Sequence, residues 1–360
     1  MVEWKKLVSV ADVLYGYPFE SSFFSEDSDN IPLIRIRDVK PAIASTYFSG
    51  NYSEDYIIRK GDILVGMDGE FNLEKWNDRN GLLNQRVLKL SGREGLSIDG
   101  YLYHYMGPVF KNVEKQTPGG SVKHLSAKVI NSLIIPIPSL SEQERIVGIL
   151  DTFTASIDNL KAQIVQRRKQ YEFYRDQLLD LEGKEGVEMK TLGEIAINLD
   201  YKRKPITSSK RVSGDYPYYG ASGIVDYVEG YIFDGNYLLI SEDGANLIMR
   251  TTPIAFSITG KNWVNNHAHV LEFKDKVTQK IVEIYINMID LSPWINGAAQ
   301  PKLNQANLNM IEIPIPSLQE QHRIVSILDT FEASIANLES QLKQREKQYE
   351  YYRNKLLTFE

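Results

Sequence analysis

The chain has no cysteine among its 360 residues. Disulfides, thiolate metal sites and thiol nucleophiles are therefore excluded. No apolar run approaches the roughly 18 residues of a membrane-spanning helix, and the N-terminus leads into no uninterrupted apolar segment of the kind found in signal peptides. These absences predict a cytoplasmic protein with no membrane partner.

An excess of basic residues is also missing. Lys and Arg number 41 against 47 Asp and Glu, which gives a formal net charge of −6. Proteins that bind nucleic acid nonspecifically by themselves are usually basic, because the release of counterions from the phosphates supplies most of their affinity. The isolated chain is therefore not expected to bind DNA strongly.

Motifs for catalysis or cofactor binding are absent too. We find no phosphate-binding G-x-x-x-x-G-K-[ST], no G-x-G-x-x-G after a strand and no G-x-S-x-G elbow. An amino-methyltransferase that flips its target base is expected to carry an Asn-Pro-Pro-Tyr-like segment, and none occurs. Asp68 and Asp243, each followed by glycine, are interpreted as turn residues rather than catalytic acids. A nuclease built from dispersed carboxylates stays open as an alternative.

One histidine pair invites a metal-site hypothesis. His267 and His269 lie two residues apart on a predicted strand, so their side chains would share a face and could begin a metal site. No further cluster of ligands is evident. A polar or core pair is the preferred interpretation.

One segment occurs twice. Residues 135–182 and 313–360 are identical at 33 of 48 aligned positions. Both copies begin with Ile-Pro-Ile-Pro, whose prolines disfavour helix in the residue before them. A Ser-x-x-Glu capping box follows at Ser139 and again at Ser317, and it predicts the start of a helix.

Apolar residues in both copies then step by four and three, which is typical of a coiled coil. In the first copy the series is Ile146, Leu150, Phe153, Ile157, Leu160, Ile164, Arg167, Tyr171, Tyr174, Leu178 and Leu181. In the second it is Ile324, Leu328, Phe331, Ile335, Leu338, Leu342, Arg345, Tyr349, Tyr352, Leu356 and Phe359. Two such helices in one chain predict an antiparallel coiled coil that separates two globular domains related by a pseudo-two-fold axis.

Arg167 and Arg345 interrupt the apolar series at the same place. The preferred interpretation is that the aliphatic stem packs while the charged head reaches solvent or pairs with a glutamate across the seam. The alternative is that the arginine sets the register of the helices at a cost in stability. The tyrosines of each copy are interpreted as core, with a partner-facing aromatic ledge as the alternative: Tyr171, Tyr174, Tyr349 and Tyr352.

The rest of the chain forms two α+β domains. Residues 1–138 are predicted to be the first domain and 187–316 the second; helical regions occupy 139–182 and 317–360, and 183–186 form a linker. The second domain follows the plan of the first with a different sequence, since Asp243-Gly244 follows a strand as Asp68-Gly69 does, and residues 264–270 take the place of 83–87. Gly119-Gly120 predicts a loop. Near-identical helices thus alternate with diverged domains.

Loops of both domains carry groups suited to nucleic acid. Amide, imidazole and cationic groups that could contact base edges are Asn84, Gln85, Arg86, Lys261, Asn265, Asn266 and His267. Groups that could position phosphates are Lys123, His124, Lys202, Arg203, Lys204, Gln300 and Lys302. Each residue taken alone is also an ordinary surface or turn residue.

The run Ile-Pro-x-Pro-x-Leu-x-Glu-Gln-x-x-Ile, at 135–146 and 313–324, resembles the domain-end motif of the DNA-specificity subunits of type I restriction–modification systems. Residues 81–87, 216–224 and 263–270 also resemble motifs of this family. The resemblance covers nearly the whole chain. It implies two target-recognition domains, each followed by a conserved helical region.

The same resemblance implies a function and partners. Each domain would read one half of a split, asymmetric double-stranded DNA target, and the helices would set the gap between the halves. Two methyltransferase subunits would dock on the helical regions, and restriction (translocase) subunits would join them. S-adenosylmethionine, ATP and Mg²⁺ are expected on those partners, and no cofactor on this chain. The alternatives are a stand-alone nuclease and a coiled-coil adaptor that binds proteins.

Overall fold

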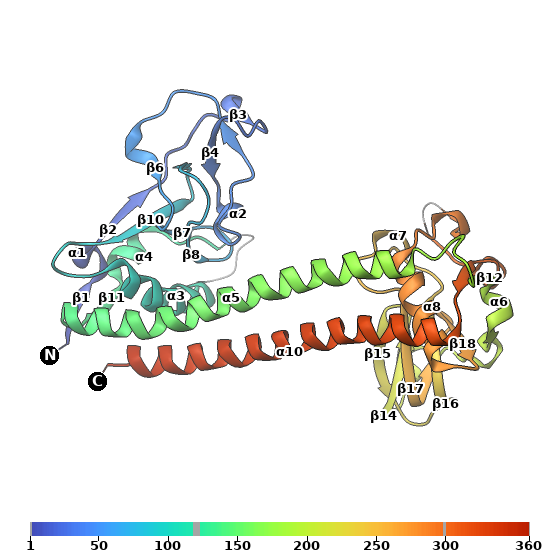
Figure 1. Ribbon diagram of the computed structural model, residues 1–360. Helices are drawn as coiled ribbons and strands as arrows, with labels where there is room; N and C mark the ends of the chain where they lie inside the picture. Colours follow the sequence, from blue (N-terminus) through green and yellow to red (C-terminus); the bar gives the residue numbers. More distant parts are fainter. Residues whose placement is uncertain (1, 118–122, 298–299, 360) are drawn as a thin grey trace. The chain divides into compact units, whose positions relative to one another are not determined.

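A computed structural model describes residues 2–117, 123–297 and 300–359 (Figure 1). The chain divides into two compact units. Unit 1 comprises Met1–Lys161 and Ser340–Glu360, and unit 2 comprises Ala162–Glu339. Each unit contains one globular domain and a half of each long helix. The loop predicted at Gly119-Gly120 lies outside the described residues.

A short two-stranded ribbon leads into each long helix. In unit 1, β1 (Glu3–Lys6) pairs antiparallel with β11 (Ile134–Ile137), so that Glu3 lies opposite Ile137. In unit 2, β12 (Glu188–Thr191) pairs with β19 (Glu312–Ile315) in the same register. The Ile-Pro-Ile-Pro motif is thus a strand paired on one side only, where proline is tolerated because no second ladder needs its missing N–H.

The main sheets share four strands in the same order. In unit 1 the order is β2 (Ala11–Tyr15), β10 (Val87–Gly92), β7 (Ile63–Gly66) and β8 (Leu73–Lys75). In unit 2 it is β13 (Ala196–Asn198), β18 (Ala268–Phe273), β16 (Phe233–Ser241) and β17 (Ala255–Val264), extended by β14 (Ser213–Gly220) and β15 (Gly223–Val228). One helix packs on each sheet, α3 (Asp99–Gln116) in unit 1 and α8 (Lys276–Met288) in unit 2.

Smaller elements complete the units. Unit 1 also has a five-stranded sheet of β3 (Phe24–Ser25), β5 (Tyr47–Phe48), β4 (Ile31–Ile34), β9 (Gly81–Leu83) and β6 (Ile57–Ile58). The short helices are α1 (Leu7–Val10), α2 (Ile36–Val39), α4 (Ala127–Ser132), α6 (Leu192–Ile195), α7 (Asn246–Met249) and α9 (Gln305–Asn309). The prediction of two α+β domains with a common plan is confirmed.

The two long helices are α5 (Leu140–Leu179) and α10 (Leu318–Leu357), each of 40 residues. The hydroxyls of Ser139 and Ser317 accept from the third backbone N–H beyond them, at 3.4 and 3.3 Å, as the predicted caps require. The linker after α5 contains Gly183 and Gly186, whose φ values of 72° and 77° lie in the left-handed region that favours glycine.

The antiparallel pairing of the helices is confirmed in each unit (Figure 1). In unit 1, Phe153 near the start of α5 stacks on Tyr352 near the end of α10, with ring centroids 5.2 Å apart. In unit 2, the repeat-equivalent rings Phe331 and Tyr174 stack at 5.3 Å with the helices exchanged. The internal repeat is therefore also a repeat of contacts.

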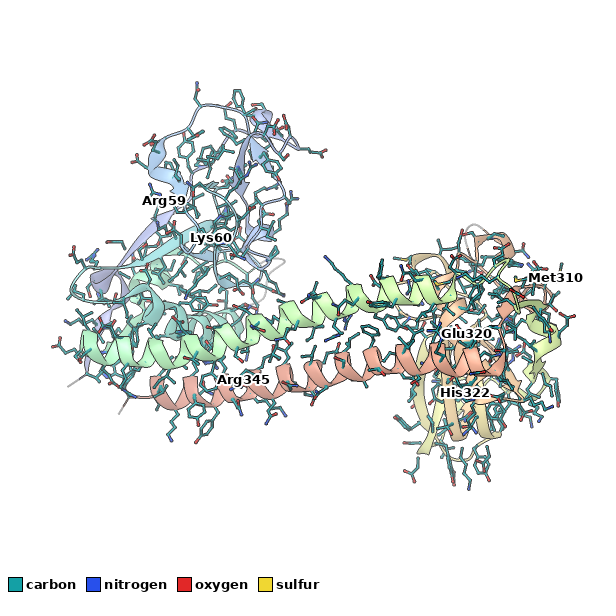
Figure 2. All side chains as sticks on the ribbon, viewed as in Figure 1. Arg59, Lys60, Met310, Glu320, His322 and Arg345 are labelled. Atoms are coloured by element: carbon teal, nitrogen blue, oxygen red, sulfur yellow. The ribbon has the colours of Figure 1, made fainter. Side chains whose placement is uncertain are left out.

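The interrupting arginines each face an aromatic ring of the opposite helix, and their role in setting the register stays a prediction. The guanidinium of Arg345, a residue of α10 (Figure 2), lies 5.7 Å from the ring centroid of Phe153, and that of Arg167 lies 5.8 Å from Phe331. The charged head therefore lies over an aromatic ring of the opposite helix, in a cation–π contact, rather than beside the expected glutamate. Tyr171 and Tyr349 are half-buried as core residues. Tyr174 and Tyr352 are 43% and 40% exposed, so the core assignment was wrong for this second pair.

Other seam residues follow the prediction unevenly. Leu150, Ile157, Leu160, Ile164 and Leu328 are buried. Ile335, Leu338 and Leu342 are only half-buried. In the described ranges, no helix combines the length and apolar character needed to cross a membrane.

A buried histidine joins the first domain to both helices. His104 of α3 is 1% exposed, with Nε2 2.8 Å from Asp151 Oδ1 on α5 and Nδ1 3.0 Å from the hydroxyl of Tyr349 on α10. Burial lowers the pKa of His104, and the opposing effect of Asp151 does not fully offset it. A neutral ring satisfies both contacts, since Nε2–H donates to Asp151 while Nδ1 accepts from Tyr349. In unit 2, Lys280 of α8 instead pairs with Glu332 of α10 at 3.2 Å.

The lowered pKa of His104 predicts a pH-dependent attachment. Below about pH 6.5, the unfolded-state pKa of histidine, His104 is protonated in the unfolded chain but stays neutral in folded unit 1 until a lower pH. The stability of unit 1 therefore falls as the pH falls. We expect wild-type unit 1 to lose more stability between pH 7.5 and 5.5 than the His104→Gln variant. Hydrogen exchange of α3 amides at the two pH values measures the difference. Equal losses would contradict the assignment.

Candidate nucleic-acid interface

Three segments of unit 1 meet beyond the end of β7. The backbone N–H of Met67 donates to the carbonyl of Arg86 at 2.9 Å, that of Gly69 to Lys123 at 2.9 Å, and that of Leu125 to Met67 at 2.7 Å. The turn after β7, the turn before β10 and the segment before α4 are thereby fixed to one another. This framework gathers loops that are far apart in the sequence.

Unit 2 repeats the framework with different residues. The N–H of Glu242 donates to the carbonyl of His267 at 2.9 Å, that of Gly244 to Pro301 at 3.2 Å, and that of Leu303 to Glu242 at 2.8 Å. Each bond has its counterpart in unit 1. The predicted correspondence of residues 264–270 with 83–87, and of the two Asp-Gly turns, is confirmed.

The equivalent bonds assign equivalent side chains. Asp243 corresponds to Asp68, and each forms an isolated antiparallel bridge with the third segment, at Lys302 and His124 respectively. His267 corresponds to Arg86. Both aspartates lie in turns followed by a glycine of positive φ, 73° at Gly69 and 108° at Gly244, as the interpretation of the Asp-Gly pairs requires.

In unit 1 the framework carries an exposed group of polar side chains. Asp68 Oδ1 lies 2.6 Å from His124 Nδ1, and Asp68 Oδ2 lies 3.5 Å from Arg86 Nε. Gln85 is exposed beside them, whereas Asn84 is 5% exposed and its Oδ1 has no hydrogen-bond partner among the described residues. Most of the predicted set of this domain therefore lies at one place. In contrast, Lys123 directs Nζ to the carbonyl of Glu114 at 2.7 Å.

In unit 2 the corresponding group borders a hollow. Asp243 Oδ2 lies 2.9 Å from the ring Nδ1 of His267, and the backbone N–H of His267 donates to Asn265 Oδ1 at 2.8 Å. The hollow measures about 550 Å³ and is lined by Asn265, Asn266 and His267 together with residues of β14 and the segment before it. Two of these additional residues, Arg211 and Tyr218, stack at 4.5 Å. Sequence reasoning missed Arg211, which lies just before β14, because nothing in its sequence neighbours signals that it lines the same hollow as Asn265–His267.

The remaining predicted residues of unit 2 are spread more widely. Lys302 and Gln300 are exposed next to the turn that carries Asp243. Lys261 lies on β17 over the ring of Tyr231, at 4.7 Å, and so belongs to a different part of the sheet. Lys202 and Lys204 are exposed in the segment after β13. The framework therefore gathers only part of the predicted set.

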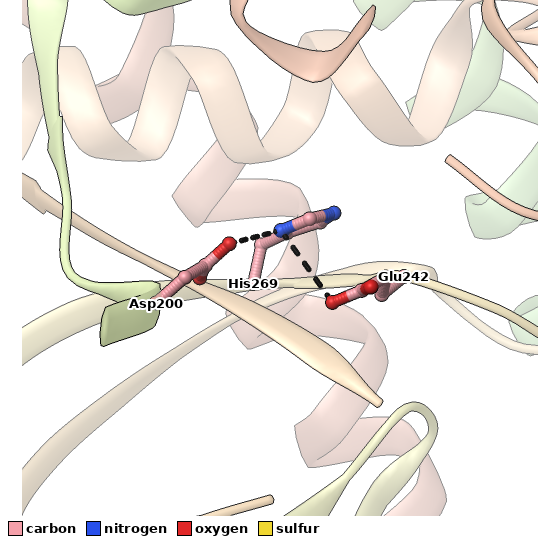
Figure 3. A group of neighbouring side chains, drawn as sticks. All are labelled: Asp200, Glu242 and His269. Atoms are coloured by element: carbon pink, nitrogen blue, oxygen red, sulfur yellow. Dashed lines mark hydrogen bonds and ion pairs between the residues drawn. The ribbon is translucent and has the colours of Figure 1, made fainter. Parts of the chain in front are cut away.

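A network of charged side chains lies beneath this site (Figure 3). His269 is fully buried, with Nδ1 2.6 Å from Asp200 Oδ2 and 3.9 Å from Glu242 Oε2, and with Nε2 2.7 Å from the carbonyl of Leu303. Because both ring nitrogens face acceptors, a doubly protonated ring satisfies every contact. Arg203 donates to Glu242 at 2.6 Å and lies 3.3 Å from Asp200.

The network sets the charge of its carboxyl groups. Burial alone would raise the pKa of Asp200, but its contacts with His269, the Val270 N–H and Arg203 outweigh burial and hold that pKa below its usual value. The pKa of Glu242 is also lowered, because its contacts with neighbouring cations outweigh the effect of burial, which alone would raise it. Both groups are therefore carboxylates matched by neighbouring cations.

Asp200, Glu242 and His269 lie close enough together to hold a metal ion. Arg203 and, at 3.1 Å from Glu242, Lys302 already neutralise the two carboxylates, and a metal would have to displace these cations. The chemistry of the site therefore favours a structural ion network. The predicted pairing of His267 with His269 on one strand was wrong, since β18 begins at Ala268 and the two rings bind different aspartates.

The network also changes one predicted contact. The Arg203 side chain is 13% exposed and donates to Glu242 and to the carbonyl of Ala268. A guanidinium committed to these acceptors is poorly placed to contact a phosphate as well. By the same framework bonds, unit 1 has Leu88 where unit 2 has His269 and Met67 where unit 2 has Glu242, so this network belongs to unit 2 alone.

Comparison with known proteins identifies the repeated architecture. The family model described as the type I restriction modification DNA specificity domain matches twice, at residues 1–167 and 184–347. The chain belongs to this specificity family. The family that matches is one of DNA specificity and not of nucleases.

Curated relatives agree with the assignment. A putative type I restriction enzyme specificity subunit of Haemophilus influenzae is 44% identical over 188 residues, which are 50% of this chain and 48% of that protein. The EcoBI specificity subunit of Escherichia coli is 40% identical over 44% of this chain and 33% of its own length. The chain thus spans half or less of the length of these two relatives. The EcoR124I/EcoR124II specificity subunit of E. coli is 32% identical over 84% of this chain and 82% of that one.

A solved structure shares the fold of the family member described here. The type I restriction–modification S subunit from M. genitalium superposes with a TM-score of 0.68 at 16% identity, covering 100% of this chain and 97% of that one. At this identity the likeness concerns the fold alone.

Proposed function

We propose that the chain is the noncatalytic DNA-specificity subunit of a type I restriction–modification complex, in which each unit reads one half of a split, asymmetric duplex target. The observation that carries the proposal is the pair of equivalent frameworks with different exposed side chains. Unit 1 presents Arg86 and His124 where unit 2 presents His267 and Lys302. Equal frameworks with unequal donors suit two different half-sites.

The repeat also supports two equal docking sites for a partner. One face of the helices is kept in both copies: Thr152, Ala155, Ser156, Asn159, Gln163, Gln166, Gln170 and Tyr174 are identical in α5 and α10, and position 173 is aromatic in both. These residues step by three and four, so they form one stripe. The stripe carries no charge and is largely exposed in both helices.

A second face of the same helices varies. The five positions 154, 158, 161, 165 and 168 also step by four and three, and all five differ from their counterparts Glu332, Ala336, Glu339, Lys343 and Glu346. Two residues of this variable face form ion pairs within unit 2: Glu332 pairs with Lys280 at 3.2 Å and Glu339 with Arg168 at 2.5 Å. The variable face thus differs between the two helices, whereas the kept face presents the same residues twice, as two copies of one partner would require.

Each kept face ends in an exposed aromatic pair. Phe173 and Tyr174 in unit 2 are 58% and 43% exposed, and Tyr351 and Tyr352 in unit 1 are 60% and 40% exposed. The rings of each pair meet edge to face, with centroids 5.4 and 5.2 Å apart. Exposed aromatic residues on a rigid helix are typical anchors of protein interfaces. We propose that each pair anchors one methyltransferase subunit.

The partners complete the function. The methyltransferase subunits would supply S-adenosylmethionine and the methyl transfer, and restriction subunits would supply ATP- and Mg²⁺-dependent translocation and cleavage. Partner contacts to phosphates would also offset the net charge of −6 of this chain. A cytoplasmic location is consistent with a DNA target and with partners that use S-adenosylmethionine and ATP.

A change of helix length tests the bipartite part of the proposal. Duplicating residues 164–170 in α5 together with 342–348 in α10 adds one heptad to each helix and preserves the phase of the seam. Seven residues add about 10.5 Å, or about three base pairs, to the gap between half-sites. Mapping methylated sites in cells that carry the complete system should find both half-site sequences unchanged and the gap longer.

The control for this experiment is a seven-residue Gly/Ser insertion in the linker 183–186, which lengthens the chain and not the helices. It should leave the gap unchanged. An unchanged gap after the double heptad duplication would overturn the spacer role.

A further inference from the structure

The side chain of Arg86 is held in an unusual position. Arg86 has a φ of 70°, a left-handed conformation that is uncommon outside glycine. Its carbonyl is held by the N–H of Met67 at 2.9 Å, and its side chain is 55% exposed. Strained residues of this kind persist where the surrounding structure fixes them, and they cluster at functional sites.

Asp68 engages one edge of the Arg86 guanidinium. Asp68 Oδ2 faces Nε of Arg86 at 3.5 Å, while Asp68 Oδ1 faces Nδ1 of His124 at 2.6 Å. In the part of the chain that the structure describes, Asp68 is the only carboxylate within ion-pair distance of Arg86. Nη1 of Arg86 also lies 3.5 Å from Nδ1 of His124, the same ring nitrogen that faces Asp68 Oδ1, so among the described residues the Nη1–Nη2 edge has no carboxylate or carbonyl acceptor. A guanidinium held at Nε presents this edge as a planar fork.

The base that matches such a fork is guanine. Its O6 and N7 accept two parallel hydrogen bonds from arginine in the major groove, and no other base offers two adjacent acceptors on that edge. We propose that Arg86 reads a guanine in the half-site of unit 1, and that Asp68 is the positioning residue that aligns the fork. This inference rests on the proposed function in DNA recognition.

Unit 2 is built differently at the same place. Asp243 holds Nδ1 of His267 at 2.9 Å, which leaves Nε2 as the single outward nitrogen. One nitrogen makes one hydrogen bond, so this position cannot form the bidentate contact that specifies guanine. The aspartates are therefore equivalent positioning residues with different readers, and the guanine requirement belongs to the half-site of unit 1 only.

The test uses the complex of the full chain with its methyltransferase subunits and a duplex library randomised across the target. Arg86→Lys keeps the charge and removes the fork, and Arg86→Gly also suits the left-handed backbone. For both variants, preference for guanine at one position of one half-site should fall roughly 5- to 150-fold, the range expected for loss of one bidentate contact. Asp68→Asn should weaken the same preference to a smaller extent, and Asp68→Glu should partly restore it.

Two controls accompany the variants. The preference at the other half-site should stay unchanged, which shows that the variant complex is folded and assembled. Arg59→Gly removes another exposed arginine of unit 1 (Figure 2) and should leave every base preference as in wild type.

The outcomes separate the two proposals. A wild-type complex without any sequence preference would overturn the function in DNA recognition. If the wild-type complex shows a bipartite preference and Arg86→Lys leaves that preference unchanged, only the assignment of Arg86 is overturned. The same holds if the half-site of unit 1 contains no required guanine. A uniform loss across all bases would make Arg86 a phosphate contact and would equally reject the proposal.

Discussion

Replacing Asp200 by alanine is expected to destabilise unit 2 by about 3–5 kcal/mol, the usual cost of removing one partner from a buried ion pair. The carboxylate accepts from His269 Nδ1 at 2.6 Å and from the Val270 N–H at 2.9 Å, and it lies 3.3 Å from Arg203. Its removal leaves Nδ1 of His269 and the backbone N–H of Val270 without this acceptor in the interior. This loss exceeds what a surface substitution causes.

Hydrogen exchange of β18 measures this effect separately from unit 1. The matched control is Asp226→Ala, which removes an aspartate that is 45% exposed and pairs with Arg211 at 3.3 Å, where about 0–1 kcal/mol is expected. Because the pKa of Asp200 is lowered, its contribution is present above the unfolded-state pKa of about 3.9 and is lost as the pH falls below it. Similar protection of β18 in both variants would show that the network does not stabilise unit 2.

Placing a charge in the exposed aromatic pairs is expected to prevent assembly with the methyltransferase. Phe173→Glu acts on the pair in unit 2 and Tyr351→Glu on the pair in unit 1, where the side chains are 58% and 60% exposed. Exposed positions tolerate glutamate in the free chain, whereas an interface anchor that is truncated or charged loses at least about 2 kcal/mol, or roughly 30-fold in affinity. Each single variant should bind one methyltransferase subunit normally, and the double variant should bind neither tightly.

Val165→Glu is the matched control for Phe173→Glu. Val165 is apolar, 55% exposed and on the same helix, but it belongs to the variable face, where the second copy already has Lys343. Titration of the methyltransferase subunit followed by native mass spectrometry counts the bound copies. If Val165→Glu weakened binding as much as Phe173→Glu, the kept face would not be the docking surface.

Local rules predicted the helical part of the molecule well. The capping serines Ser139 and Ser317 directly precede the two helices, and the step of four and three places Phe153 and Phe331 at the seam. These features depend on neighbours within one or two turns, which is why a linear pattern reveals them. The contacts of Arg167 and Arg345 with the facing rings depend on the opposite helix, and periodicity could not show them.

The candidate site was predictable only in part. Amide and guanidinium groups marked the turns at Asn84–Arg86 and Asn265–His267, and the structure places each turn against an Asp-Gly turn. The pairing of Asp68 with Arg86 and of Asp243 with His267 joins residues 18 and 24 positions apart. A carboxylate in a turn looks the same in sequence whether it ends a strand or aligns a neighbouring side chain. For the same reason Arg203 was predicted to contact phosphates at the surface, although its guanidinium pairs with the largely buried Glu242.

The sequence by itself determined the repeat, the two helices with their caps and phase, the absence of known catalytic motifs and the resemblance to the specificity family. All of these are carried by residue identity and spacing along one chain. Only the tertiary structure decided which loop residues lie together and which cations are already committed to carboxylates. Those answers depend on contacts between segments far apart in sequence, whose geometry no local pattern encodes.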